Sequence, residues 1–129
     1  MNIKWNTVII GIIIAFVLNF ALSMFAGALG GIIAYLLATI YIGYIVGGDY
    51  RNGAVHGAIV GFVAYSLVHI IGGIVIVINT GVLSGGFDFL VIVLIGVILA
   101  GMEGAIGGSI GVLIRRSRSS KGIKVKPQS

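Results

Sequence analysis

The chain has 129 residues, of which 59% are hydrophobic and 9% are charged. Soluble domains contain roughly 45–50% apolar and about 25% charged residues, so this composition excludes an ordinary soluble domain. Eight Lys and Arg residues outweigh three Asp and Glu residues, and the absence of cysteine excludes disulfides and thiolate chemistry.

Four apolar runs predict the elements of the fold, and they cover 7–25, 29–46, 54–78 and 87–114. A hydrocarbon core ~30 Å thick needs about 20 apolar helical residues to cross it. We therefore expect an all-α integral membrane protein, a four-transmembrane-helix bundle of two antiparallel hairpins with glycine-zipper packing. The membrane domain is expected over 1–114, and a basic cytoplasmic tail over 115–129.

The first three predicted helices each carry a polar residue at about the same level. These residues are Asn19, Tyr35 and His69, and the turn between the first two helices is very short. One interpretation is a layer of interhelical hydrogen bonds that fixes packing, worth ~0.6 kcal/mol per bond on average. The other interpretation is a functional site inside the bilayer.

The third and fourth predicted helices carry glycines at intervals of about four residues. These are Gly53, Gly57 and Gly61 in the third helix and Gly96, Gly104, Gly107, Gly108 and Gly111 in the fourth. Such a face lets another helix approach closely, whereas lipid gains nothing from it. We expect packing within the bundle for the third helix. For the fourth helix, packing within the bundle and self-association remain open.

Glu103 is the residue that most needs an explanation, because it lies about nine residues, or ~13 Å, from the cytoplasmic end of its span. A charge at that depth is costly, so such residues usually face protein or water. Helical geometry places Glu103 at the edge of the glycine face and ~9 Å from His69 in depth. It is either a proton- or cation-linked carboxylate or a neutral carboxyl hydrogen-bonded to Thr39.

The basic residues predict the orientation in the membrane. Lys4, Arg51 and six residues after 114 all lie on one side if both termini are cytoplasmic, as the positive-inside rule favours. We therefore expect a multi-pass protein of the cell membrane with cytoplasmic N and C termini. The tail is expected to contact anionic lipid headgroups through Arg115, Arg116, Arg118 and Lys121.

Motifs for catalysis, cofactors and metals are weak or absent from the sequence. The pattern Gly-x-Ser-x-Gly occurs at 107–111, but that motif needs a strand-to-helix turn and here lies in a predicted helix. We expect no enzyme activity, cofactor or metal site. Nucleic-acid binding is not expected either, because the basic tail lacks interleaved aromatic residues. His56 lies near the predicted interface and is expected to be solvated.

Two segments carry a resemblance to a known family. The segments IGYIVGG at 42–48 and NGAVHGAIVG at 52–61 resemble a small archaeal membrane-protein family catalogued as domain of unknown function 5518. The resemblance covers nearly the whole chain and implies a glycine-rich, four-spanning protein of an archaeal cell membrane. It implies no activity and no site residues.

Two functions are compatible with these patterns. The first is a small multi-pass membrane protein of structural or accessory type, self-associating as a homo-oligomer or part of a larger membrane complex. The alternative is a minimal oligomeric transporter or channel, linked to protons or cations, that uses Glu103.

Overall fold

The computed structural model describes residues 2–81 and 86–122, with backbone alone at 86–88 and 121–122. The described chain consists of three α-helices: α1 (Trp5–Val46), α2 (Tyr50–Thr80) and α3 (Gly86–Gly122). Each is long and apolar enough to cross a membrane. These helices indicate a membrane-embedded protein.

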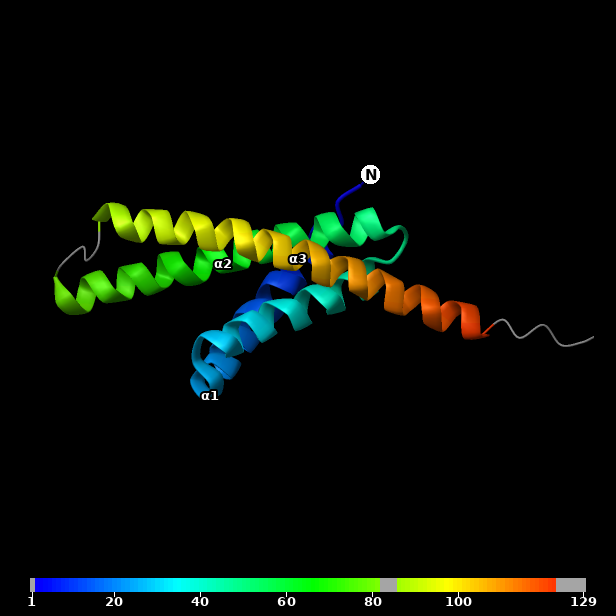
Figure 1. Ribbon diagram of the computed structural model, residues 1–129, viewed down its shortest axis with the longest axis horizontal. Helices are drawn as coiled ribbons and strands as arrows, with labels where there is room; N and C mark the ends of the chain where they lie inside the picture. Colours follow the sequence, from blue (N-terminus) through cyan, green and yellow to red (C-terminus); the bar gives the residue numbers. More distant parts are fainter. Residues whose placement is uncertain (1, 82–85, 123–129) are drawn as a thin grey trace, which may run out of the picture.

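Helix α1 is folded back on itself at one residue, Gly27. Its φ of 56° and ψ of −134° are the only non-helical angles inside α1, and glycine reaches this region without the steric cost of a Cβ. Because of this bend, Gly11 in the first half of α1 lies against the side chain of Ile42 in the second half. In a straight helix these two residues would be ~46 Å apart. Figure 1 shows the two halves of α1 running beside each other.

The prediction of four separate helices is wrong, because the described chain has three. The expected helices 7–25 and 29–46 are one helix, α1, in which a single glycine stands where a very short turn is expected. The run 54–78 lies within α2. The run 87–114 lies within α3, which continues through the start of the predicted tail to Gly122, where Arg and Lys are good helix formers.

Asp49 and three glycines set the ends of α1 and α2. The carboxylate of Asp49 accepts a hydrogen bond from the Tyr50 backbone N–H at 2.9 Å, as a residue at a helix N-terminus commonly does. Gly81 ends α2 in the left-handed conformation, with a φ of 66°, which glycine favours at this position. Gly47 and Gly48 also have positive φ and turn the chain from α1 into α2.

Helices α2 and α3 pack through their backbones. A Cβ added at Gly57 would overlap the carbonyl oxygen of Gly104, and one at Gly108 would overlap that of Gly53. A Cβ at Gly61 would likewise overlap the carbonyl oxygen of Ala100. The glycines therefore bring the two helix axes closer than larger residues would allow.

Helix α1 covers the other part of the small-residue face of α3. Gly107 contacts the side chain of Thr39, Gly111 contacts the carbonyl of Ile40, and Gly43 contacts Gly108. The face considered for self-association is thus occupied within the chain, by α1 and α2 together. Gly96 lies nearer the start of α3, where the ring of Tyr65 fills the space beside it.

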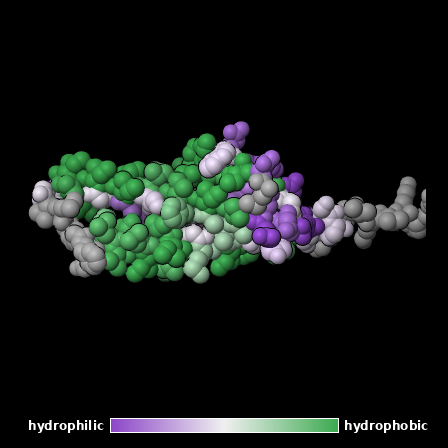
Figure 2. Space-filling model, turned by 90° about the horizontal axis from the view of Figure 1, so that it is seen from above, coloured by the Kyte–Doolittle hydropathy of each residue, from purple (hydrophilic) through white to green (hydrophobic). Residues whose placement is uncertain are grey.

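Hydrophilic residues gather at one end of the molecule, and apolar residues cover most of the rest of the described face that is visible (Figure 2). This end joins the start of α1, the turn between α1 and α2, and the last turns of α3. The Lys4 ammonium lies 3.4 Å from the carbonyl oxygen of Val46. Arg115 donates to the carbonyl oxygens of Tyr44 at 3.2 Å and Ile45 at 2.8 Å, which the end of a helix leaves without an intrahelical partner.

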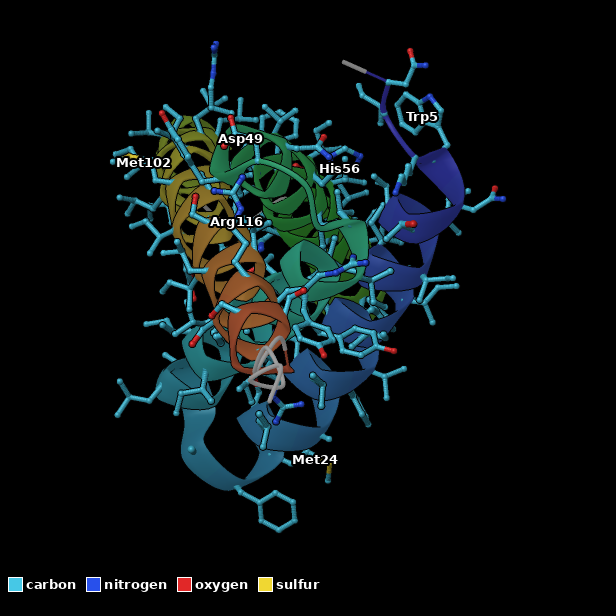
Figure 3. The ribbon with its side chains drawn as sticks, turned by 90° about the vertical axis from the view of Figure 1, so that its right-hand side faces the viewer. Trp5, Met24, Asp49, His56, Met102 and Arg116 are labelled. Atoms are coloured by element: carbon cyan, nitrogen blue, oxygen red, sulfur yellow. The ribbon has the colours of Figure 1, made fainter. Side chains whose placement is uncertain are left out.

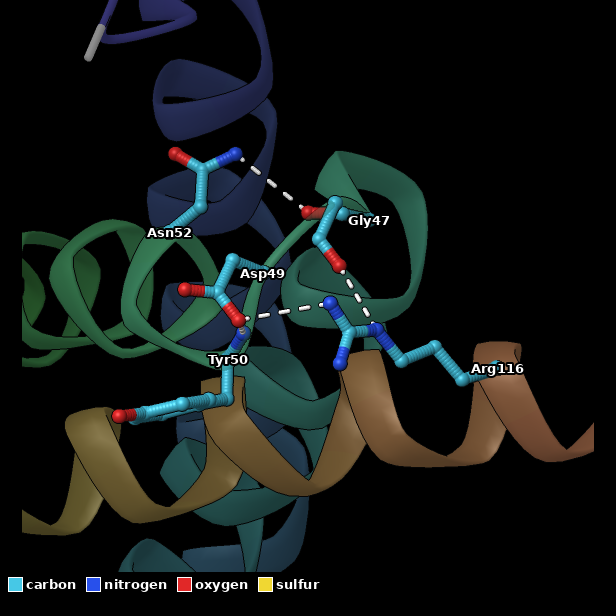
Figure 4. Close-up of polar contacts among 6 residues, drawn as sticks. Gly47, Asp49, Tyr50, Asn52 and Arg116 are labelled. Atoms are coloured by element: carbon cyan, nitrogen blue, oxygen red, sulfur yellow. Dashed lines mark hydrogen bonds and ion pairs between the residues drawn. The ribbon is translucent and has the colours of Figure 1, made fainter.

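Arg116 ties α3 to the turn between α1 and α2 (Figure 4). Its Nε donates to the carbonyl oxygen of Gly48 at 3.0 Å, and its Nη2 lies 3.4 Å from the Asp49 carboxylate. Asn52 closes the same turn by donating to the carbonyl oxygen of Gly47 at 3.4 Å. The charged end is therefore a structural junction of all three helices.

Candidate binding site

A pocket of about 640 Å³ lies among the three helices. Figure 1 shows that α1 diverges from the α2–α3 pair toward its bend, and residues of all three helices line the pocket. Its polar lining residues are Asn19, Ser23, Tyr35, Tyr65, His69 and Glu103. The other lining residues are glycine or aliphatic.

The structure places the four polar residues singled out from the sequence, Asn19, Tyr35, His69 and Glu103, on the wall of this one pocket. Sequence analysis missed Tyr65 and Ser23. A signal for both exists, because Tyr65 lies four residues before His69, and Ser23 lies four residues after Asn19. Residues four apart share a helix face.

Three aromatic rings form one side of the pocket. The rings of Tyr65 and His69 stack with their centroids 3.9 Å apart and an interplanar angle of 20°. The ring of Tyr35, on α1, lies 6.0 Å from that of Tyr65 and is tilted by 47°. This row of rings connects α1 to α2 across the pocket.

The polar groups of this layer do not satisfy one another. Tyr35 is only 4% exposed, and its buried hydroxyl has no hydrogen-bond partner within residues 2–81 and 86–122. The Nδ1 of His69 lies 3.0 Å from the carbonyl oxygen of Tyr65 on its own helix. Because a carbonyl only accepts, Nδ1 carries the proton in this bond. The expected layer of hydrogen bonds between helices is not formed.

Glu103 is the acidic residue of the pocket. Its Oε1 is buried without a hydrogen-bond partner in the described part of the chain. The alternative bond to Thr39 is not found among the described residues. The Thr39 hydroxyl shares its proton between the carbonyl oxygens of Tyr35 and Leu36, at 2.8 and 3.1 Å.

This arrangement suits a positively charged or hydrogen-bond-donating group. Leaving a buried polar atom unpaired costs about 1–3 kcal/mol, and buried polar atoms nearly always have a protein or water partner. The lining includes one carboxyl group and neither lysine nor arginine. No group of three or more His, Asp or Glu residues that could hold a metal occurs among the residues described.

A model of the family of unknown function DUF5518 matches residues 5–114. The chain belongs to this family. No curated protein and no solved structure matches the chain significantly. The DUF5518 family is not assigned an activity, so the function of this member has to be argued from its geometry.

His56 of this DUF5518 chain is buried, and the expectation that it is solvated is wrong. Its side chain is 0% exposed. Its Nε2 accepts from the Lys4 backbone N–H at 2.9 Å, and its Nδ1 lies 2.7 Å from the carbonyl oxygen of Asn52. These bonds need a neutral ring with the proton on Nδ1. His56 therefore joins the start of α1 to α2, and it is not among the residues that line the pocket.

The residues expected to contact lipid headgroups have different surroundings. Arg115 and Arg116 hydrogen-bond the end of α1 and the turn after it, and Figure 3 shows Arg116 beside Asp49 at this end of the bundle. Arg118 is exposed. The side chain of Lys121 lies outside the described residues. Contact with headgroups remains a prediction, and it fits Arg118 better than the two residues used inside the fold.

Proposed function

We propose that the protein is a minimal proton- or cation-linked membrane transporter that binds its cation in the pocket through Glu103. The observation that carries this proposal is the pair of buried atoms Glu103 Oε1 and Tyr35 Oη. Both belong to pocket-lining residues, and neither has a partner among the described residues. A transport carboxylate has to exchange partners during its cycle, and an oxygen not held by the protein is available to do so.

The position of Glu103 along α3 supports this function. It lies twelve positions before Arg115, which corresponds to ~18 Å of helix. In a hydrocarbon core ~30 Å thick, that distance places the carboxyl deep inside. Ionisable residues at such depth are rare in membrane helices and commonly mark ion or proton pathways.

The pocket lies within one chain, so this proposal does not require an oligomer. The structural or accessory function expected from the sequence relied partly on a free small-residue face on α3. Helices α1 and α2 cover Gly104, Gly107, Gly108 and Gly111 of that face. Self-association would therefore need another surface, and the pocket supports transport more directly than the packing supports an accessory role.

Proteoliposomes with an internal pH-sensitive dye test the proposal. Under an imposed gradient of protons, Na⁺ or K⁺, we expect the wild type to move protons or cations faster than protein-free liposomes. Glu103→Gln keeps the shape of the side chain but cannot become a carboxylate, so its flux should fall to the protein-free rate.

The matched control is Asp49→Asn, which makes the same acid-to-amide change at a half-exposed side chain outside the pocket. It should retain the wild-type flux. Absence of flux in the wild type under every gradient, or full flux in Glu103→Gln, would contradict the proposal and favour an accessory function.

A further inference from the structure

The pocket is too large for a bare inorganic cation as its sole ligand. Its volume is about 640 Å³, whereas a water molecule occupies roughly 30 Å³ in the liquid. Sites for small organic molecules generally measure about 300–1,000 Å³. The volume therefore matches an organic ligand.

Its wall offers a hard metal ion a single charged ligand, because the oxygen-bearing side chains other than Glu103 are neutral. Ions such as Ca²⁺ and Mg²⁺ take about six or more oxygen ligands. Glu103 is the one carboxyl-bearing residue on this wall, and most of the other lining residues are glycine or aliphatic. A wall that combines glycine and aliphatic residues with neutral polar groups and one acidic group fits a molecule that has an apolar body and one charged end.

The charge and the rings of the wall select the sign of that end. Neither lysine nor arginine lines the pocket, so an anion would find repulsion from Glu103 without compensation. The rings of Tyr35, Tyr65 and His69 line one side, and the faces of tyrosine rings attract cations. Glu103 Oε1 and Tyr35 Oη can each accept a hydrogen bond, and an ammonium donates up to three.

We propose that the pocket binds organic ammonium ions, in which the ammonium meets Glu103 and Tyr35 and an aromatic or aliphatic body fills the apolar part. This inference rests on the proposed function and names the class of its substrate. Glu103 and Tyr35 contact the charged end, and the size of the body is limited by the residues at the margin of the pocket. One of these is Ala28, an exposed residue next to the bend of α1.

Three probes of the same shape and different charge test this inference. They are 4-phenylbutylammonium, 4-phenylbutanol and 4-phenylbutanoate. Binding to the full-length protein in nanodiscs is measured by isothermal titration calorimetry, with protein-free nanodiscs subtracted. We expect the ammonium to bind about tenfold or more tightly than the alcohol, and the carboxylate to show no binding.

Two pocket variants separate the two ends of the ligand. Glu103→Gln should abolish the preference for ammonium over alcohol. Ala28→Phe should weaken the binding of both, because its ring would fill part of the pocket from an exposed position. Ala21→Phe makes the same change at an exposed residue of α1 outside the pocket lining, and it should bind both probes as the wild type does.

The outcomes distinguish this inference from the proposed function. Equal binding of ammonium and alcohol, or an ammonium preference that survives in Glu103→Gln, would overturn it. Equal weakening by Ala21→Phe and Ala28→Phe would also overturn it, because the body of the ligand would then not lie in the pocket. Glu103-dependent flux of inorganic cations without ammonium preference would overturn the substrate class and leave transport standing. Ammonium preference without flux in any gradient would keep the ligand class and remove transport.

Discussion

At the scale of single residues, His56 shows how one side chain joins two helices. Its ring uses one nitrogen as an acceptor and the other as a donor, toward the Lys4 backbone N–H and the Asn52 carbonyl. Each partner is a backbone group at or near the start of a helix. Backbone groups buried without a partner are costly, so removing the ring leaves two of them to be satisfied differently.

We therefore expect His56→Ala to lower the free energy of unfolding by roughly 2–3 kcal/mol, through lost hydrogen bonds and a cavity. Thermal unfolding in detergent, followed by circular dichroism, measures the effect. His69→Ala is the matched control, because within the described part of the chain His69 hydrogen-bonds the carbonyl of its own helix alone. A loss of stability in His69→Ala as large as that in His56→Ala would contradict the structural role of His56.

Sequence analysis identified part of the pocket but missed the role of His56. Asn19 and Glu103 stand out because they are polar within apolar runs, which is a property of the sequence alone. The partner of His56 is a backbone N–H of another helix, and backbone groups carry no sequence signal. Tyr65 is uncharged, and the signal for it is its i, i+4 relation to His69.

At the scale of helices, the contact between α2 and α3 depends on which glycines face a neighbour. Gly104 lies against the backbone of Gly57, whereas nothing lies within 4 Å of a Cβ added at Gly101. The two glycines are three residues apart in the same helix. Both are therefore interior residues of the same helix, and they differ in the atoms that surround them.

Gly104→Ala should destabilise the protein, because its methyl group would overlap the Gly57 carbonyl and push the helices apart. Gly101→Ala should be neutral or stabilising by up to about 1 kcal/mol, since alanine favours the helix over glycine. The thermal unfolding temperature of both variants in detergent decides the matter. Equal shifts in the two variants would mean that helix propensity, rather than the contact, determines the effect.

Glycine spacing predicted which faces of α2 and α3 are small, but the number of helices was predicted incorrectly. A reversal of the chain usually needs several residues with turn preferences. In α1 it takes Gly27 alone, and Gly27 is one of 22 glycines. Which glycine adopts a positive φ depends on the packing of the two halves of α1, such as Gly11 against Ile42.

At the scale of the whole molecule, the separation of charge along the bundle sets its expected orientation. The start of α1, the turn after Val46 and the last turns of α3 meet at one end, and the hydrophilic surface of Figure 2 gathers there. After Arg51, α2 has neither lysine nor arginine up to its other end at Thr80. Basic residues favour the cytoplasmic side of a membrane.

We therefore expect Ser119→Cys, near the charged end, to react with an impermeant thiol reagent only after cells are made permeable. Asn79→Cys, near the opposite end of α2, should react on intact cells. The natural chain has no cysteine, so the wild type gives the background of the labelling. Labelling of Ser119→Cys on intact cells, with Asn79→Cys protected, would reverse the orientation.

The divergence of α1 from the other two helices also determines the medium from which the pocket fills. Ile32 and Leu99 line the pocket and are 53% and 59% exposed, so its margin has aliphatic side chains that face acyl chains in a bilayer. An amphiphilic ligand then enters from the lipid phase, where its concentration is set by its partition coefficient. The apparent affinity, calculated from the total ligand concentration, should rise with the lipophilicity of the ligand and fall as lipid is added. Both changes are expected even when every contact in the pocket stays the same.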